Sequence, residues 1–249
     1  MIEPSLYRAP KSLLQDKVVL VTGGGSGIGR QAAFVFAQHG AEVILLGKNA
    51  SNLEQTYDLL KKNNLKKPVI QAIDFERAEE EDFSQIARVV LDEFGKLDGL
   101  LNNAGVLGRK TPIQNYDSKQ WKKVLKINLD SAFLLTKSLL PVLEIPNNSS
   151  IIFTSSGVGK KGRAYWGAYG VSKFATEGLV QILSEELDKT SGIRVNAINP
   201  GPVRTKMRSE AYPAEDQKTL PNPKEIMNAY LYLMGKDSLG ITGKSIEAQ

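Results

Sequence analysis

The stretch Val18-Val-Leu-Val-Thr-Gly-Gly-Gly-Ser-Gly-Ile-Gly29 decides the fold. A β-branched apolar run leads into a glycine-rich turn, and apolar residues at helical spacing follow from Gly27 to His39. Glycines permit a tight turn and close backbone approach, while a helix N-terminus offers free N–H groups and a partial positive charge. The stretch therefore predicts a strand, a phosphate-binding turn and a helix, in the order that dinucleotide-binding folds require.

The same alternation of strand and helix continues along the chain. Continuous apolar strands between amphipathic helices predict a parallel sheet that is covered on both faces. The fold class is accordingly α/β: a single Rossmann-type domain over residues 16–249, with a doubly wound parallel sheet of about seven strands. The predicted strands are 17–21, 42–46, 69–73, 99–101, 150–154, 194–198 and 245–246, and the predicted helices are 27–39, 51–63, 79–94, 118–140, 168–189 and 224–234.

Two segments lie outside this alternation. Residues 1–15 lack the apolar centre of a signal peptide, and we expect them to be an exposed N-terminal extension. Residues 203–223 are polar, contain prolines and have weak periodicity. An irregular segment of this length inside a compact domain is usually a lid or a binding loop, with a plain surface connection as the alternative.

The composition excludes several classes of function. The chain has no cysteine, which removes disulfides, cysteine-bound zinc and thiol nucleophiles. The single histidine, His39, argues against histidine metal clusters and Ser-His-Asp hydrolysis, so no metal site is predicted. No apolar run approaches the ~20 residues that span a bilayer. We therefore expect a cytoplasmic protein without a membrane partner.

The net charge of +5 comes from lysines and arginines scattered along the chain. Scattered cations are typical of a solvated surface, so we predict no nucleic-acid partner. Binding of nucleic acid stays as an alternative that would depend on salt. An anionic substrate or a phosphorylated cofactor explains the basic balance more simply.

Lys48 indicates which nicotinamide cofactor is bound. A site for NAD usually carries an acid about 20 residues after the glycine turn, where it binds the ribose 2′-hydroxyl. Here the second predicted strand ends Leu46-Gly-Lys-Asn49, and no acid occurs from Val43 to Leu53. Because Lys48 can pair with a 2′-phosphate, we predict NADP(H) rather than NAD(H).

Five motifs follow one another in a set order: Thr22-Gly-x-x-x-Gly-x-Gly29, Asn102-Asn-Ala-Gly105, Ser156, Tyr169-x-x-x-Lys173 and Pro200-Gly201. Each motif alone is weak, but their order and distances resemble the short-chain dehydrogenase/reductase family over about residues 15–247. The chain looks most similar to the bacterial YciK-type branch. The resemblance implies an oxidoreductase that interconverts a carbonyl and an alcohol by hydride transfer.

Tyr169 and Lys173 are suited to proton transfer on physical grounds. They are four residues apart on a helical pattern and therefore share one face. A free tyrosine titrates near 10, which is too high for acid–base work at neutral pH. A cation at about 4 Å contributes roughly 4 kcal/mol at an effective dielectric of 20, which is about 3 pKa units. Lys173 is thereby expected to bring the phenol of Tyr169 near neutrality.

The resemblance also implies the other site residues. Tyr169 is the general acid/base, Lys173 also anchors the nicotinamide ribose, Ser156 bonds the substrate oxygen, and Asn128 bends its helix and holds a relay water. Ser26 departs from the family pattern, since NADP-preferring members often have a cation there. The implied cofactor contacts are Gly23, Ser26, Gly27, Ile28, Gly29, Lys48, Asp74, Phe75, Asn102, Ala104, Gly105, Tyr169, Lys173, Pro200, Gly201, Val203 and Thr205.

The substrate and the partners are less closely defined. We expect the substrate pocket to include Val158, Arg163, Trp166 and Met207, with Trp166 favouring an apolar or ring-bearing substrate and Arg163 an anionic group. The family commonly assembles through its two long helices, which implies a homodimer or homotetramer through 118–140 and 168–189. A catalytically silent NADP(H)-binding or redox-sensing protein is the alternative to an enzyme.

Overall fold

The predicted strand–turn–helix unit forms as β1 (Val18–Thr22) and α1 (Gly27–Gln38), which the glycine turn joins. A computed structural model describes residues 3–249 of the chain. All five residues of β1 are buried, because this strand lies in the interior of the sheet between β2 and β4. The other strands are β2 (Glu42–Gly47), β3 (Val69–Ala72), β4 (Gly99–Asn102), β5 (Ser150–Thr154), β6 (Arg194–Asn199) and β7 (Ser245–Glu247).

The strands of residues 3–249 form one parallel sheet of seven, in the order β3-β2-β1-β4-β5-β6-β7. The strand order reverses between β1 and β4, and ligands bind at such a switch point beyond the carboxyl ends of the strands. The prediction of a doubly wound α/β domain with about seven parallel strands is confirmed.

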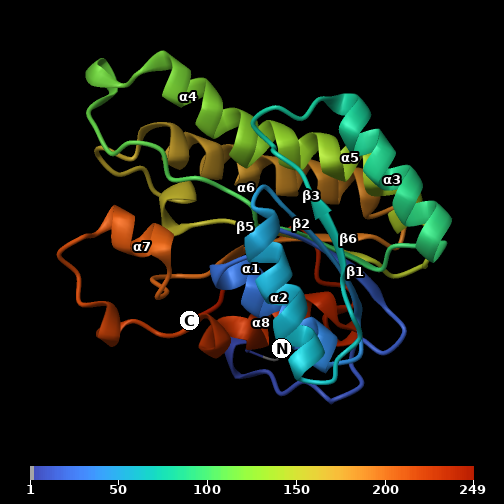
Figure 1. Cartoon of the computed structure of the whole chain (residues 1–249). Coiled ribbons are helices and arrows are strands. Elements are labelled where there is room, and N and C mark those ends of the chain that lie inside the picture. Colours follow the sequence, from blue (N-terminus) through green and yellow to red (C-terminus); the bar gives the residue numbers. More distant parts are fainter. Residues whose placement is uncertain (1–2) are drawn as a thin grey trace.

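Helices cover both faces of the sheet (Figure 1). On one face, α1 and α8 contact each other and bury Phe36 and Tyr230. On the other face, α3 packs against α5, and Phe83 and Leu139 are fully buried there. Within residues 3–249, none of the helices has the length and apolar character that a bilayer crossing requires. The remaining helices are α2 (Ala50–Lys62), α3 (Glu80–Phe94), α4 (Ser118–Leu125), α5 (Ser131–Leu143), α6 (Gly167–Leu187), α7 (Lys206–Ala211) and α8 (Met227–Met234).

The long helix predicted over 118–140 is interrupted at Asn128. A π-helical turn, Lys126–Asp130, separates α4 from α5. The side chain of Asn128 bonds the backbone of Val106 instead of facing solvent: its Oδ1 accepts from the Val106 N–H at 2.8 Å, and its Nδ2 donates to the Val106 carbonyl at 3.0 Å. A π turn of this kind often marks a functional position in a helix.

Most of residues 3–15 are exposed, as expected, but three apolar side chains of this segment, Tyr7, Leu13 and Leu14, are buried. Leu14 is fully buried, and Tyr7 is 4% exposed. The Tyr7 hydroxyl donates to Asp237 at 2.6 Å, and its ring packs edge-on against Tyr232. This segment precedes β1 in the sequence, but it packs against α8, and its buried residues belong to the same hydrophobic core as α8.

The predicted lid-like segment 203–223 contains regular structure. Thr205 caps α7, with its hydroxyl accepting from the Arg208 N–H at 3.2 Å, and a 3₁₀ turn follows at Gln217–Thr219. A two-point ion pair between Arg208 and Glu215 joins α7 to the chain beyond it. Figure 1 shows α7 at the left of the view, apart from the helices that cover the two faces of the sheet.

Candidate active site

A long cleft runs along the carboxyl ends of the strands and consists of two adjoining cavities. The first, of about 250 Å³, lies beside Lys48 and Asp74, and we call it the open end. The second, of about 280 Å³, lies beside Tyr169 and Lys173, and we call it the buried end. Both cavities share walls at the glycine turn and at the end of β4: Gly23, Ser26, Ala104 and Gly105.

The glycine turn leaves room that side chains would fill. Gly23 has φ +67°, and a Cβ there would lie 3.1 Å from the backbone of Ala104. A Cβ on Gly29 would collide with the carbonyl of Gly23. Ser26 precedes α1 in extended conformation, and its side chain does not cap the N–H groups of the first helical turn, which borders the cleft at Gly27 and Ile28. An extended dinucleotide with a pyrophosphate at this helix N-terminus fits the two cavities and the turn between them.

The end of β4 is fastened to β1 by Thr22 and Asn103. The Thr22 hydroxyl accepts from the N–H groups of Asn103 and Ala104 at 2.9 and 3.0 Å. Asn103 Nδ2 in turn donates to the Thr22 carbonyl at 3.1 Å. Sequence reasoning did not single out either residue for the site, although both lie inside the motifs that it used.

Asn102, a predicted cofactor contact, lines neither of the two cavities of the cleft and borders instead a small cavity beside Lys173. It is 6% exposed, and its Nδ2 donates to Thr136 on α5 at 3.0 Å. Successive side chains of a strand point to opposite faces, so only one of two neighbouring asparagines can line the cleft. Asn103 lines the buried end and is therefore a further candidate cofactor contact.

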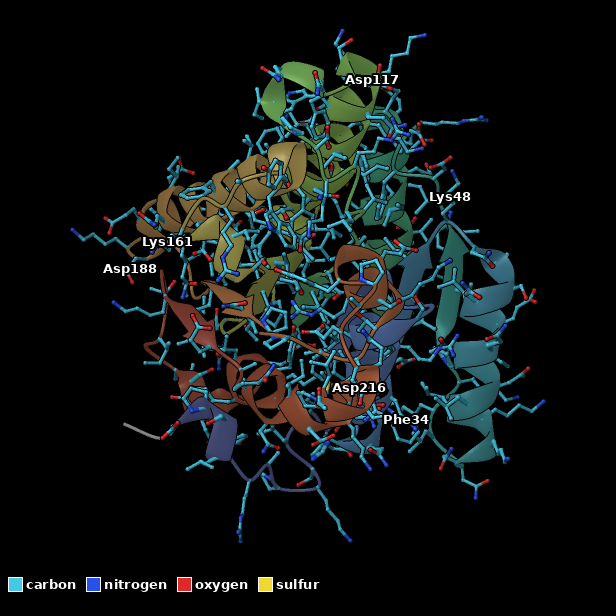
Figure 2. The ribbon with its side chains drawn as sticks, turned by 90° about the vertical axis from the view of Figure 1, so that its left-hand side faces the viewer. Phe34, Lys48, Asp117, Lys161, Asp188 and Asp216 are labelled. Atoms are coloured by element: carbon cyan, nitrogen blue, oxygen red, sulfur yellow. The ribbon has the colours of Figure 1, made fainter. Side chains whose placement is uncertain are left out.

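Charged side chains gather at the open end. Lys48 follows β2 and lies 2.9 Å from Asp74, which follows β3. The Lys48 side chain is 66% exposed, and Figure 2 shows it at the surface close to the start of α2. The hydrogen bond from Lys48 lowers the pKa of Asp74 below its ordinary value. Phe75 lines the same cavity, so all three predicted residues lie together.

Tyr169 and Lys173 lie at the buried end, one turn apart on α6. Tyr169 is 8% exposed and Lys173 is 5% exposed. The ammonium group of Lys173 donates to the Thr154 carbonyl at 2.6 Å and lies 5.7 Å from the centre of the Tyr169 ring. Ser156 follows β5 and lines the same cavity.

Burial dominates the protonation of this pair. Burial raises the pKa of Tyr169 above its ordinary value, and the hydroxyl of Ser156 acts in the opposite direction. Burial lowers the pKa of Lys173 to about 8. The expectation of a phenol near neutrality assumed a cation at about 4 Å in a polar medium. In this structure the cation is bound to Thr154 and desolvation is the larger effect, so the neutral phenol is favoured.

Asn128 reaches α6 from the π turn. It is 3% exposed, and its Nδ2 donates to Ser172 Oγ at 3.1 Å in addition to its two bonds with Val106. Asn128 and Lys173 also line a cavity of about 10 Å³, the size of one water molecule. The predicted relay residue is thus close to the lysine.

Two of the four predicted pocket residues lie elsewhere. Trp166 and Met207 line the buried end, together with Leu107 and Ala211. Val158 packs beneath Tyr169 in an apolar cluster and does not line the cavity. Arg163 lies in an exposed segment and does not reach it. The pocket wall is therefore more apolar than predicted, and an anionic group at Arg163 has no structural support.

The turn after β6 forms the remaining wall. Pro200, Gly201, Val203 and Thr205 line the buried end, as do Gly27 and Ile28 of α1. Gly201 has φ +68°, which favours glycine. Gln249 Nε2 donates to the carbonyls of Pro200 and Pro202 at 2.5 and 3.2 Å. No local motif in the sequence pointed to this contact, because the two partners are joined only by the folded sheet.

Known proteins share this fold and are similar to this chain over nearly its whole length. The uncharacterized oxidoreductase YciK of Escherichia coli is 43% identical over 243 residues, covering 98% of this chain and 96% of its own length. The solved structure of yciK from E. coli has a TM-score of 0.95 at 42% identity and covers 98% of this chain and 99% of the other. A protein from E. coli CFT073 solved with NADPH has a TM-score of 0.94 at 44% identity, covering 97% of this chain and all (100%) of the other.

The predicted similarity to the YciK-type branch is confirmed by these comparisons. The family pattern described as short chain dehydrogenase matches residues 17–216, from the start of β1 to the segment after α7. This match covers the glycine turn, α6 and the turn after β6. The chain is an oxidoreductase that belongs to the short chain dehydrogenase family.

Proposed function

We propose that the protein interconverts a carbonyl and an alcohol with NADP(H), and that Tyr169 is its general acid/base. The observation that carries the proposal is the single cleft with a phosphate-binding turn in the middle, Lys48 at one end and the Tyr169–Lys173 pair at the other. NADPH supplies the hydride when it is bound. Every other step belongs to side chains of this chain.

Tyr169 is suited to donate a proton to the substrate oxygen. Its phenol is buried and its pKa is raised, so the proton is present at neutral pH. The hydroxyl of Ser156 orients the same oxygen and stabilises the negative charge that develops on it. A neutral phenol is the form that protonates the alkoxide produced when hydride adds to a carbonyl, and the same side chain accepts that proton in the reverse reaction.

Lys173 supports Tyr169 during the proton transfer. Its positive charge favours the phenolate that remains after the proton has left. Asn128 holds Ser172 and the backbone of Val106, and it borders the small cavity beside Lys173 through which a water can return the proton. This assigns Asn128, Ser156, Tyr169 and Lys173 to the catalytic centre.

The preference for NADP(H) is assigned to Lys48. It is the cation that borders the open end where β2 stops, and no acid from Val43 to Leu53 competes for the ribose hydroxyl. The structural neighbour solved with NADPH supports the same preference. The apolar wall of Leu107, Trp166, Met207 and Ala211 supports a substrate whose body is apolar or ring-shaped.

A screen of ketones, aldehydes and alcohols with NADPH and NADH, followed by the nicotinamide absorbance, tests this function. Tyr169→Phe is expected to lower kcat by about 10³-fold on any substrate found, within the range for acid–base catalysis. The affinity for NADPH measured by fluorescence should change little. Undiminished turnover by Tyr169→Phe would overturn the mechanism, and tight NADPH binding with no turnover across the screen would favour a cofactor-binding or redox-sensing protein.

We also propose that the chain assembles as a homodimer or homotetramer through α4–α5 and α6. These helices carry large apolar side chains at the surface: Phe133, Val171, Phe174 and Ile182 are each between 44% and 61% exposed. Such a patch is typical of a surface that a second copy covers. Light scattering at micromolar concentration tests the assembly, and Phe174→Ser should lower the observed mass if α6 forms the interface.

A further inference from the structure

Glu177 is a third polar residue on the catalytic face of α6. It lies one turn beyond Lys173, which lies one turn beyond Tyr169. Residues at this spacing project from the same side of a helix. The mechanism above uses the first two residues and leaves the carboxylate without a role.

The carboxylate of Glu177 joins two strands to the helix. Its Oε1 accepts hydrogen bonds from Ser155 Oγ, at the end of β5, and from Ser245 Oγ, at the start of β7, the latter at 2.9 Å. Ser155 is 1% exposed and directly precedes Ser156. Bonds to an ionised acceptor are stronger than neutral ones, so this carboxylate limits the movement of the segment that carries Ser156.

The charge of Glu177 also acts on Lys173. The groups that face Lys173 are the Thr154 carbonyl from β5, Tyr169 and Glu177 from α6, and Asn128 from the π turn. Tyr230 of α8 completes this environment next to Tyr169 and Thr154. Among these groups, Glu177 carries the negative charge, which raises the pKa of Lys173 against the larger effect of burial.

We propose that Glu177 is a positioning residue of the catalytic centre, which holds the Ser155–Ser156 segment against α6 and stabilises the positive charge of Lys173. This inference rests on the proposed function, because it assigns Glu177 a role through Ser156 and Lys173. It adds a fifth polar side chain to the four that the sequence indicated.

Two variants separate the two parts of the role. Glu177→Gln keeps an oxygen acceptor for Ser155 but removes the charge. Ser155→Ala removes a hydrogen bond and keeps the charge. Glu185→Gln is the matched control, since Glu185 lies two turns further along α6 and is exposed.

The charge is tested on the whole protein without any substrate. Lysine labelled at Cε allows the titration of Lys173 to be followed by NMR, with the signal assigned by its loss in Lys173→Met. In Glu177→Gln the midpoint is expected to move about one pH unit lower, as for the loss of a nearby opposite charge. In Ser155→Ala and Glu185→Gln it should stay where it is. An unchanged midpoint in Glu177→Gln would show that the carboxylate does not stabilise the lysine.

The positioning role is tested by kinetics on a substrate from the screen. As the pH rises, Glu177→Gln is expected to lose activity at a lower pH than wild type does, because Lys173 loses its proton at a lower pH in this variant. Ser155→Ala should lower kcat about tenfold at every pH, with the KM for NADPH unchanged. Wild-type kcat in Ser155→Ala would remove the positioning role. If Tyr169→Phe is also fully active, the proposed function itself fails, whereas an inactive Tyr169→Phe confines the failure to Glu177.

Discussion

Each end of the cleft contains a lysine, and the two lysines lie in opposite environments. At the open end, the Lys48 side chain is 66% exposed and pairs with Asp74 at 2.9 Å. At the buried end, Lys173 is 5% exposed, and its ammonium donates to the Thr154 carbonyl at 2.6 Å, an uncharged partner. The pairing lowers the pKa of Asp74, whereas burial lowers the pKa of the buried lysine itself to about 8.

The difference separates recognition from chemistry. An exposed, paired charge contributes modestly and is screened by salt, so it suits the choice between two cofactors that differ by one phosphate. A buried lysine changes its protonation within reach of neutral pH, so it suits proton transfer. Variants at the open end should therefore change cofactor affinity, and variants at the buried end should change kcat and its pH dependence.

Lys173→Met is expected to have the largest effect. Methionine keeps the apolar stem but removes the charge that favours the phenolate, so kcat should fall by about 10³-fold. Stopped-flow measurement of hydride transfer, with NADPH affinity measured separately, distinguishes loss of chemistry from loss of binding. If the variant binds NADPH more weakly but transfers hydride at the normal rate, the contrast between the two ends fails. The buried lysine would then serve the binding of the cofactor and not proton transfer.

Lys48→Asp is expected to have the next largest effect, on cofactor choice. The change places a third acid beside Asp74 and Glu76 and removes the cation predicted to pair with the 2′-phosphate. A lost charge-assisted hydrogen bond of about 1.5–3 kcal/mol corresponds to a binding of NADPH that is between about 10- and 140-fold weaker. The ratio of kcat/KM for NADPH and NADH measures the effect, with Lys48→Met separating lost attraction from added repulsion. An unchanged ratio would remove Lys48 from the recognition of NADP(H).

A third test concerns stability at the buried end. Lys173 has an ordinary pKa of 10.5 when unfolded and about 8 in the folded protein, so between these values the unfolded chain binds the extra proton. Stability then rises with pH, by at most about 1.4 kcal/mol per pH unit. The destabilisation is fully present below pH 8 and is relieved as the pH approaches 10.5. Urea unfolding of wild type and Lys173→Met across this range should show the rise in wild type only.

The sequence predicted the fold well because its signals are local. The glycine turn and the alternation of apolar strands with amphipathic helices both act over short stretches of chain, and the strands and main helices formed within a few residues of the predicted bounds. Tyr7 shows the limit of prediction from local sequence patterns. Its partners Tyr232 and Asp237 lie at the other end of the chain, and no periodicity within the first residues reveals them.

The candidate site shows the same limit on a smaller scale. Motifs located Tyr169, Lys173 and Ser156, because their spacing is read along one helix and one strand end. Motifs did not reveal that Asn103, and not Asn102, lines the buried end, or that Arg163 does not line it. The direction of a side chain at the end of a strand depends on the register with neighbouring strands, which only the assembled sheet defines.

A third lysine, Lys110, lies in an environment between those of Lys48 and Lys173, and its replacement is expected to have the smallest effect. Lys110 is exposed, but its ammonium lies 4.9 Å from the centre of the Trp166 ring and 4.4 Å from the centre of the Tyr212 ring. It also donates to the Ala211 carbonyl at 2.8 Å, at the end of α7. Lys110 thereby contacts α7 beside the Trp166 ring, which is tilted by 48° against the ring of Tyr169.

Lys110→Met removes the charge while keeping the length of the side chain. A cation–π contact contributes about 0.5–2 kcal/mol, so α7 should open more often and the KM of the substrate should rise by between about two- and thirty-fold. Lys161→Met, at an exposed position labelled in Figure 2, is the control. If Lys110 acts as the exposed Lys48 does, NADPH affinity will change and substrate KM will not. If Lys110 belongs to the buried end, the KM of the substrate and the rate of product release will change. The pH dependence of kcat will stay that of wild type, because the charge that titrates at the buried end is that of Lys173.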